Sequence, residues 1–339
     1  MIKNIVRALV LTSMILSCGA VTDIAKNDTE NSAQLSDNQL MDKVQQQSIK
    51  YFWDFAEPNS LLARERYHED GVYPQNDAHV ITTGGSGFGL ASIIVGVERG
   101  FIPRAEAVKR LTHMMDFLSK ADRHHGAWSH WIDGNTGKTV PFGQKDNGGD
   151  LVETAFFSFF ILMVREYFKD GNAEEKTLAQ KCDELWKGID WSWYTKGGEK
   201  VLYWHWSPNY GWEMNHKLQG YDETMITYIL AASSPTHSID AETYYKGWAR
   251  NESYTTDKTK YGLPLMVKHN YAEEYGGPLF WAQYSYIGLD PRGLSDRLVN
   301  SFEKVTKNHA LINFNYHVEN PKGFKGYGKN YWGTTASYT

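Results

Sequence analysis

Three carboxylates lie within eight residues of the stretch DNGGDLVETAF and could carry acid–base chemistry. Asp150 directly precedes a long apolar run, and Glu153 follows three residues later. This pair has the outline of a capping box, in which Asp150 caps a helix and Glu153 reaches back to the N–H of the cap. Capping gives Asp146 no role. Because neighbouring carboxylates repel one another, at least one of the three should have a raised pKa, as a general acid requires.

A second pair of acids, Asp222 and Glu223, stands in GYDETMI at the start of another predicted helix. Acids in a first helical turn complement the helix dipole, which alone would explain them. The preceding loop is unusual, because LYWHWSPNYGWEMN places four aromatic side chains within nine residues. These rings could stack on sugar faces, or the loop could fold back as a satellite core. The candidate substrate-binding residues of this loop are Trp204, Trp206, Tyr210, Trp212 and Glu213.

Other kinds of site find little support in the sequence. The histidines of DRHHGAWSHW, at positions 124, 125 and 130, do not have zinc-finger or metalloprotease spacing, and we expect no metal and no cofactor. The glycine-rich TTGGSGFG has no P-loop lysine. A serine hydrolase is disfavoured because the chain has no G-x-S-x-G elbow. The formal net charge of −5 and the absence of a long basic block argue against nucleic-acid binding.

The first residues have the character of an export signal. Lys3 and Arg7 precede a short apolar stretch that ends in ILSCG, which resembles a bacterial lipobox with Cys18 as the lipidated residue. The alternative is an ordinary signal peptide. Residues 19–38 are polar and predict a flexible tether. We therefore expect residues 1–18 to act as a lipoprotein-type signal peptide. The protein would be exported to the periplasm or outer membrane of a Gram-negative bacterium and held there by a lipid anchor.

The rest of the chain, residues 39–339, predicts an all-α domain. Apolar periodicity indicates about nine helices, several in consecutive pairs with long loops between the pairs. This pattern fits an (α/α)6 toroid in which the loops at one end form a site. A complete toroid needs about twelve helices, so we expect the barrel to be incomplete at its C-terminus. The helices are predicted within residues 41–56, 82–100, 103–121, 150–168, 173–191, 222–233, 238–249, 279–289 and 294–312.

Several segments together resemble glycoside hydrolase family 144, the endo-β-1,2-glucanases and related β-1,2-glucosidases with a glucoamylase-like domain. The matching segments are TTGGSGFGLASIIVGVERGFI, DNGGDLVETAF, LYWHWSPNYGWEMN, GYDETMITYILAASSPTH, GGPLFWAQYSYIGLDPRG and NPKGFKGYGKNYWGTTAS. Gln283 stands where family members more often have His. Gln283 and Trp332, which lie in the last two segments, complete the predicted substrate-binding set. Family members continue well beyond the last motif.

The resemblance implies an (α/α)6 barrel that hydrolyses β-1,2-glucan or its oligosaccharides with inversion at the anomeric carbon. It implies Glu223 as the general acid and leaves Asp146, Asp150 and Glu153 as candidates for the base, at a separation of roughly 6.5–9.5 Å in inverting enzymes. Two alternatives stay open. One is a lipid-anchored glycan-binding protein whose catalysis is weakened or lost by truncation, and the other is a glycosidase for another glucan linkage.

Overall fold

The computed structural model describes residues 35–270 and 272–335, and the chain divides into two compact units, Met1–Ser48 and Ile49–Thr339. The predicted signal peptide with Cys18, and most of the predicted tether, lie outside the described residues. Helix α2 (Asp37–Trp53) begins one residue before the predicted end of the tether at residue 38. None of the helices in the described ranges combines the length and apolar character that crossing a bilayer requires.

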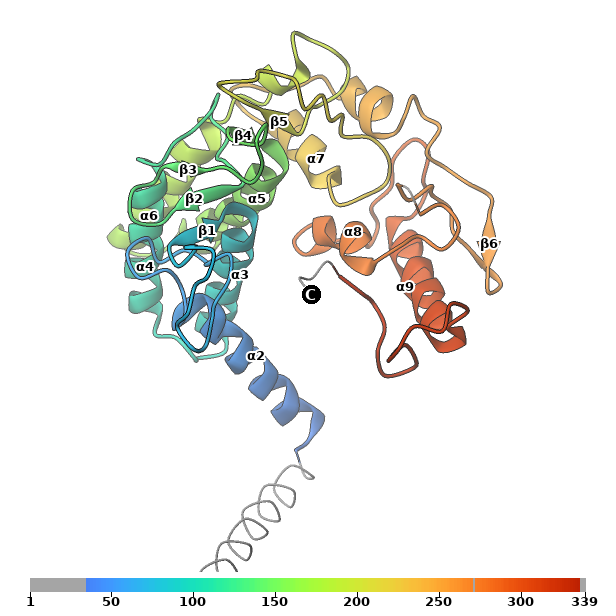
Figure 1. Cartoon of the computed structure of the whole chain (residues 1–339), viewed down its shortest axis with the longest axis horizontal. Helices are drawn as coiled ribbons and strands as arrows, with labels where there is room; N and C mark the ends of the chain where they lie inside the picture. Colours follow the sequence, from blue (N-terminus) through green and yellow to red (C-terminus); the bar gives the residue numbers. More distant parts are fainter. Residues whose placement is uncertain (1–34, 271, 336–339) are drawn as a thin grey trace, which may run out of the picture. The chain divides into compact units, whose positions relative to one another are not determined.

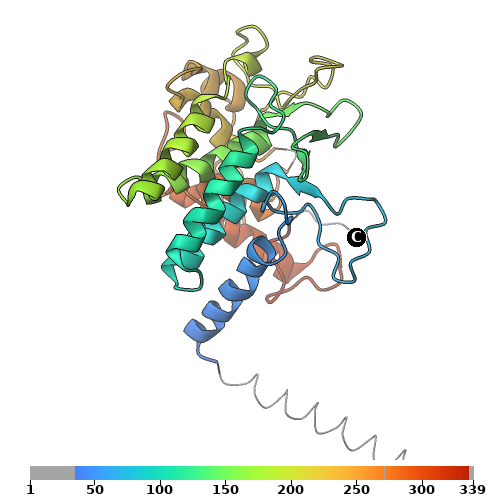
Figure 2. The same cartoon turned by 90° about the vertical axis from the view of Figure 1, so that its left-hand side faces the viewer.

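Four helices pack together at one side of the second unit (Figures 1 and 2). Helix α5 is apolar on nearly every side because it is enclosed: it packs against α3 and α6, while α6 packs against α4. Capping residues explain where two of them begin, since Pro103 precedes α4 and a capping box of Asn172 and Glu175 starts α6. The bounds are α3 Thr83–Glu98, α4 Arg104–Leu118, α5 Leu151–Phe168 and α6 Ala173–Lys187.

Helices α3 and α5 approach closely because a glycine lies at their contact. A Cβ atom at Gly87 would lie 2.9 Å from Phe157 Cα and 3.0 Å from the carbonyl oxygen of Phe156, closer than side chains normally come. Phe157 and Phe160 are fully buried on the facing side of α5. The same approach brings the N-terminus of α3 to the first turn of α5, where the predicted acids lie.

The later helices are shorter or begin later than the periodicity predicts. Helix α7 packs on α5, and α8 packs on α9. The last helix begins eight residues after its predicted start, because Asp296 accepts hydrogen bonds from the N–H groups of Leu298 and Val299 and holds a turn there. Ser301 then supplies the N-cap. The bounds are α7 Met225–Ser233, a π-helical turn Tyr244–Trp248, α8 Leu279–Gln283, a 3₁₀ turn Tyr284–Tyr286 and α9 Phe302–Glu319.

Short antiparallel strands join the loops, which the sequence did not predict. The all-α expectation is therefore confirmed only as a mostly helical architecture. Strands of two or three residues are too short to show the alternation that identifies a strand. Strand β4 pairs with β5 with Asp150 opposite His205, so the two long loops predicted to be functional meet. The strands are β1 Val80–Thr82, β2 Trp131–Asp133, β3 Thr139–Val140, β4 Gly149–Asp150, β5 His205–Trp206, β6 Thr259–Lys260 and β7 Leu263–Pro264.

Candidate active site

Asp150 caps helix α5, as predicted, but the capping box is not formed. The Asp150 Oδ1 accepts hydrogen bonds from the N–H groups of Val152 at 3.0 Å and Glu153 at 2.9 Å. The N–H of Asp150 donates to the carbonyl of Trp128, so it does not need the Glu153 side chain. Glu153 instead accepts a hydrogen bond from the N–H of Gly84, at 2.8 Å. The prediction that Glu153 reaches back to its own cap is wrong.

Glu153 therefore joins two helix N-termini. It belongs to the first turn of α5, and its Oε2 binds the N-terminus of α3. A Cβ atom at position 84 would overlap this carboxylate, so the Glu153 side chain keeps its position only with glycine there. Burial raises the pKa of Glu153 to about 7, and the charge of Asp150 adds to this effect. The sequence predicted that at least one of the three neighbouring carboxyls would have a raised pKa. In the folded protein Glu153 is such a carboxyl.

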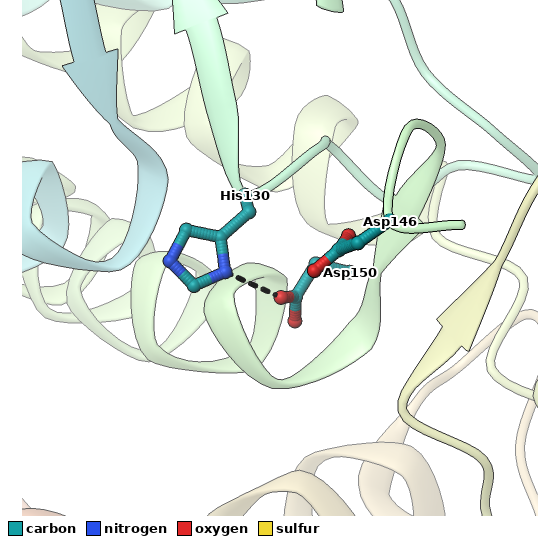
Figure 3. A group of neighbouring side chains, drawn as sticks. All are labelled: His130, Asp146 and Asp150. Carbon is teal, nitrogen blue, oxygen red and sulfur yellow. Dashed lines mark hydrogen bonds and ion pairs between the residues drawn. The ribbon is translucent and has the colours of Figure 1, made fainter. Parts of the chain in front are cut away.

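Two histidines accompany the aspartates, and Figure 3 shows one of them, His130, beside Asp146 and Asp150. The His130 Nδ1 donates a hydrogen bond to Asp150 Oδ2 at 2.9 Å. The Nε2 of His205 lies 3.2 Å from Asp146 Oδ2 and 3.6 Å from Asp150 Oδ2. Burial by itself would raise the pKa of Asp150, but the hydrogen bond from His130 and the charges of both histidines lower it. Asp150 is fully buried, and Asp146 is 7% exposed.

His130, Asp146 and Asp150 could also hold a metal ion on distance alone. One ligand atom from each lies within 4.8 Å of the other two. However, the His130 Nδ1 carries the hydrogen that Asp150 accepts (Figure 3). The imidazole of His205 also lies beside both carboxylates. The local charges can therefore balance without a metal. The expectation of a metal-free site remains a prediction.

Glu223 lies just before helix α7, which packs on α5. Burial, together with the charges of Asp222, Glu153 and Asp150, raises the pKa of Glu223 to about 8. Its neighbour Asp222 has a structural task, because its Oδ1 accepts hydrogen bonds from the N–H and the hydroxyl of Thr224. Burial raises the pKa of Asp222 as well, but the hydrogen bonds to its carboxylate counter that rise, so Glu223 is the stronger candidate for an acid that stays protonated at neutral pH.

Tyr284 was not predicted, although it is close to both glutamates. Its ring packs on Phe88 and Phe156, with ring centroids 5.0 Å and 5.7 Å away. Burial raises the pKa of its phenol, and the charges of Glu223 and Glu153 contribute to the shift. The sequence offered one signal, an aromatic residue next to the predicted Gln283.

The aromatic loop serves two purposes. Trp204 lines a cavity of about 600 Å³ beside Asp146, His130 and His205. Trp206 and Trp212 pack instead in the aromatic cluster around Trp193, which corresponds to the satellite-core alternative. Of the aromatic residues of this loop that were predicted to bind substrate, Trp204 is the one that lines the cavity, where its ring also stacks on His216. The complete lining of the cavity is His130, Phe142, Gly143, Gln144, Lys145, Asp146, Trp204, His205, Met214 and His216.

Tyr210 and Glu213 connect the two loops that border this cavity. The exposed side chain of Glu213 forms an ion pair with Lys145 at 3.0 Å. The amide of Gln144 donates a hydrogen bond to the Tyr210 hydroxyl at 3.4 Å. Both contacts tie the loop that carries Asp146 to the loop that carries Trp204. The structure therefore gives these two predicted residues a contact with protein, and their contact with substrate stays a prediction.

Gln283 and Trp332 do not line the cavity beside the acids. Gln283 lines a separate cavity of about 450 Å³ with Tyr286 and Glu303. Trp332 is 44% exposed and lies edge-on to Phe314 of α9. Their assignment to substrate binding likewise stays a prediction.

Comparison with known proteins finds relatives that are named as enzymes acting on β-1,2-glucans. A family model described as "putative glucoamylase" matches residues 215–339. A curated relative, the exo β-1,2-glucooligosaccharide sophorohydrolase (non-reducing end) of Parabacteroides distasonis, is 46% identical over 341 residues. The match spans 93% of this chain and 46% of that protein, so the chain is less than half as long as the relative.

Solved structures agree with this result. The endo-β-1,2-glucanase from Chitinophaga pinensis, in complex with sophorotriose and glucose, is 55% identical with a TM-score of 0.87, over 90% of this chain and 73% of that one. A β-1,2-glucanase from Parabacteroides distasonis is 46% identical with a TM-score of 0.82, over 90% of this chain and 45% of that one. The arrangement of acids described above thus lies on a backbone shared with these proteins.

Proposed function

Because this chain belongs to the glucoamylase-like proteins of glycoside hydrolase family 144, we propose that it hydrolyses β-1,2-linked glucan or its oligosaccharides by an inverting acid–base mechanism. One observation carries the mechanism. Glu153 lies in the first turn of α5, and Glu223 lies just before α7, which packs on α5. The pKa of each is raised, and the charge of Glu153 contributes to the shift of Glu223. Two carboxyls whose pKa values are shifted to different extents can divide the roles of acid and base.

In this mechanism Glu223 is the general acid. With a pKa of about 8 it holds its proton at neutral pH and delivers it to the glycosidic oxygen as the bond to the anomeric carbon breaks. A water molecule attacks the anomeric carbon from the opposite face and loses a proton to the base. The products are a glucan with a new hydroxyl group and a sugar with an inverted anomeric configuration.

Glu153 is the base that the geometry favours. Asp150 uses Oδ1 to cap α5 and Oδ2 to bind His130, which leaves it poorly placed to accept a proton from water. Glu153 is partly exposed, and its Oε2 is bound by the Gly84 N–H. Its pKa of about 7 lies below that of Glu223, so Glu153 ionises before Glu223 as the pH rises. Asp146, which lines the cavity, is the second candidate.

The test measures hydrolysis of linear β-1,2-glucan and of short β-1,2-glucooligosaccharides. We expect new reducing ends whose first-formed anomer, followed by NMR, is α. Glu223→Gln and Glu153→Ala should each abolish most activity, while Glu166→Gln, on the exposed side of α5, should not. Binding of glucan without new reducing ends would instead support a glycan-binding protein. Activity only on other linkages would overturn the assignment of the substrate.

Azide separates the two candidates for the base. A small anion can attack the anomeric carbon without giving up a proton, so it replaces a missing base but not a missing acid. Azide should restore activity to Glu153→Ala and produce an α-glucosyl azide. Rescue of Asp146→Ala in place of Glu153→Ala would assign the base to Asp146.

We further propose that the chain is exported and anchored through Cys18. The support is the lipobox-like ILSCG and the polar residues that follow it. Labelling cells with a radioactive fatty acid should mark the wild type and leave Cys18→Ser unmarked. Export of an unlabelled wild-type protein would favour an ordinary signal peptide.

A further inference from the structure

We propose that His130 is a positioning residue for the reaction: as an imidazolium it keeps Asp150 ionised at the N-cap of α5, and so holds Glu153 in place as a carboxylate. The inference rests on the proposed function, in which Glu153 is the base. It adds a cation to a mechanism otherwise built from carboxyl groups alone. His130 acts on Glu153 through charge and through Asp150.

Three contacts fix the orientation of His130. The Nδ1 donates to Asp150 Oδ2 at 2.9 Å, and the ring stacks on Phe142 with centroids 4.1 Å apart and 25° between the planes. The backbone carbonyl accepts a hydrogen bond from the N–H of Thr83, the first residue of α3. His130 is thus attached to both helices whose N-termini meet at Glu153.

The electrostatic surroundings favour a charged ring. Burial alone would lower the pKa of His130, but the charge of Glu153 and the hydrogen bond and charge of Asp150 raise it to about 9, with a smaller contribution from Asp146. His205 faces both aspartates, and the charge of Glu65 raises the pKa of Glu153. The other titratable groups that interact with Asp150 or Glu153 are Glu223, Tyr194, His216 and Tyr284. His130 is a cation at neutral pH under these conditions.

Removing this cation should have two consequences. The charge of His130 lowers the pKa of Glu153, so without it Glu153 should remain protonated to a higher pH. Asp150, which is fully buried, would also lose the partner of its Oδ2. A protonated Asp150 caps a helix less strongly than a carboxylate, and the first turn of α5 carries Glu153. Both effects reduce the fraction of protein with an ionised, correctly placed base.

Two substitutions separate the charge from the hydrogen bond. His130→Asn keeps an N–H donor near the position of Nδ1 and removes the charge, whereas His130→Ala removes both. We expect the acid limb of the kcat/KM profile to move upward by about one pH unit in both variants, with KM little changed. At pH values below the limb this amounts to about a tenfold loss of kcat/KM. His237→Asn, which changes an exposed histidine in the loop after α7, is the matched control and should leave the profile unchanged.

The outcomes distinguish the two ways in which His130 could act. A profile that stays in place for His130→Asn but moves for His130→Ala would show that the hydrogen bond is sufficient, and would overturn the role of the charge. A uniform loss of activity at every pH with no movement of the limb would indicate a merely structural role. Recovery of the limb of His130→Ala by added imidazole would support the proposal.

A measurement without catalysis keeps this inference separate from the proposed function. NMR titration of labelled protein reports the ionisation of His130 and of Glu153 directly. We expect His130 to remain charged beyond pH 8, and the Glu153 carboxyl to titrate at higher pH in His130→Asn than in the wild type. If the chain hydrolyses no glucan but these shifts appear, the electrostatic role stands and the catalytic assignment fails. A neutral His130 at pH 7 would refute the proposal.

Discussion

The proton held by Glu223 provides the most direct test of the site. A carboxyl with a pKa of about 8 is about nine-tenths protonated at pH 7, whereas one at its ordinary value of 4.5 would be protonated in roughly one molecule in three hundred. Glu223→Gln removes this proton and keeps the shape of the side chain. We expect kcat/KM on β-1,2-glucan to fall by about 10²- to 10⁴-fold, the usual range for a general acid.

The pH profile and the leaving group identify the role of the lost proton. The wild type should be most active between about pH 7, where Glu153 ionises, and about pH 8, where Glu223 does. Because the two carboxyls interact, both limbs belong to the pair. The Gln variant should lose the alkaline limb. It should also recover most of its rate on an aryl β-glycoside, whose leaving group needs little protonation.

The pH dependence of stability provides a second, independent test of the raised pKa of Glu223. The pKa of Glu223 is higher in the folded chain than the unfolded value of 4.5, so its contribution to stability is complete below about pH 4.5 and is lost as the pH rises towards 8. Glu223→Gln should therefore gain in Tm relative to the wild type between pH 5 and 8. An alkaline limb that persists in the variant, or an equal loss of rate on the aryl glycoside, would refute the reasoning.

Three further substitutions test the parts that support the acids. Asp150→Ala should lower the free energy of unfolding by about 2–4 kcal/mol in denaturant titrations, because it removes the cap of α5 and leaves the His130 imidazolium without its carboxylate partner. Asp150→Asn should lower the free energy of unfolding less, because it keeps an acceptor for the cap. Gly84→Ala should preserve the circular dichroism spectrum but reduce kcat, since its Cβ displaces the Glu153 carboxylate; unchanged kinetics would contradict this. Trp204→Ala should weaken glucan binding by about tenfold in calorimetry with little change in Tm, whereas Trp212→Ala should mainly lower Tm. The reverse pattern would show that Trp204 is not the tryptophan that binds the sugar.

The local signals of the sequence predicted the helices and the acids well. Apolar periodicity identified α3 to α6 with ends close to those observed, because capping residues and a buried face define such helices locally. The role of Asp150 as a cap followed from the same rules. What could not be predicted was the partner of Glu153. Its hydrogen bond to Gly84 joins residues 69 positions apart, and only the packing of two helices brings them together.

The histidines and Tyr284 were missed for a related reason. His130 reaches Asp150 only because a short strand and a loop return the chain to α5, and the three histidines of DRHHGAWSHW have no distinctive spacing. His205 faces the aspartates through a two-residue strand pair. Gln283 and Tyr284 are adjacent in sequence but lie where α8 gives way to a 3₁₀ turn, and they contact different surroundings. The direction of a single side chain at such a junction is not encoded in the apolar pattern.

The glycine between α3 and α5 restricts how this protein can be made more heat-resistant. Exchanging a helical glycine for alanine is a common route to thermostable variants, since it typically gains about 0.5–1 kcal/mol. At Gly87 the added methyl group would meet the backbone of α5, and relief requires the two helices to move apart. Separation by a few tenths of an ångström would lengthen the bond between Glu153 and the start of α3. A library selected for thermal tolerance alone would therefore be expected to accumulate substitutions elsewhere, and any survivor changed at position 87 should be screened for turnover first.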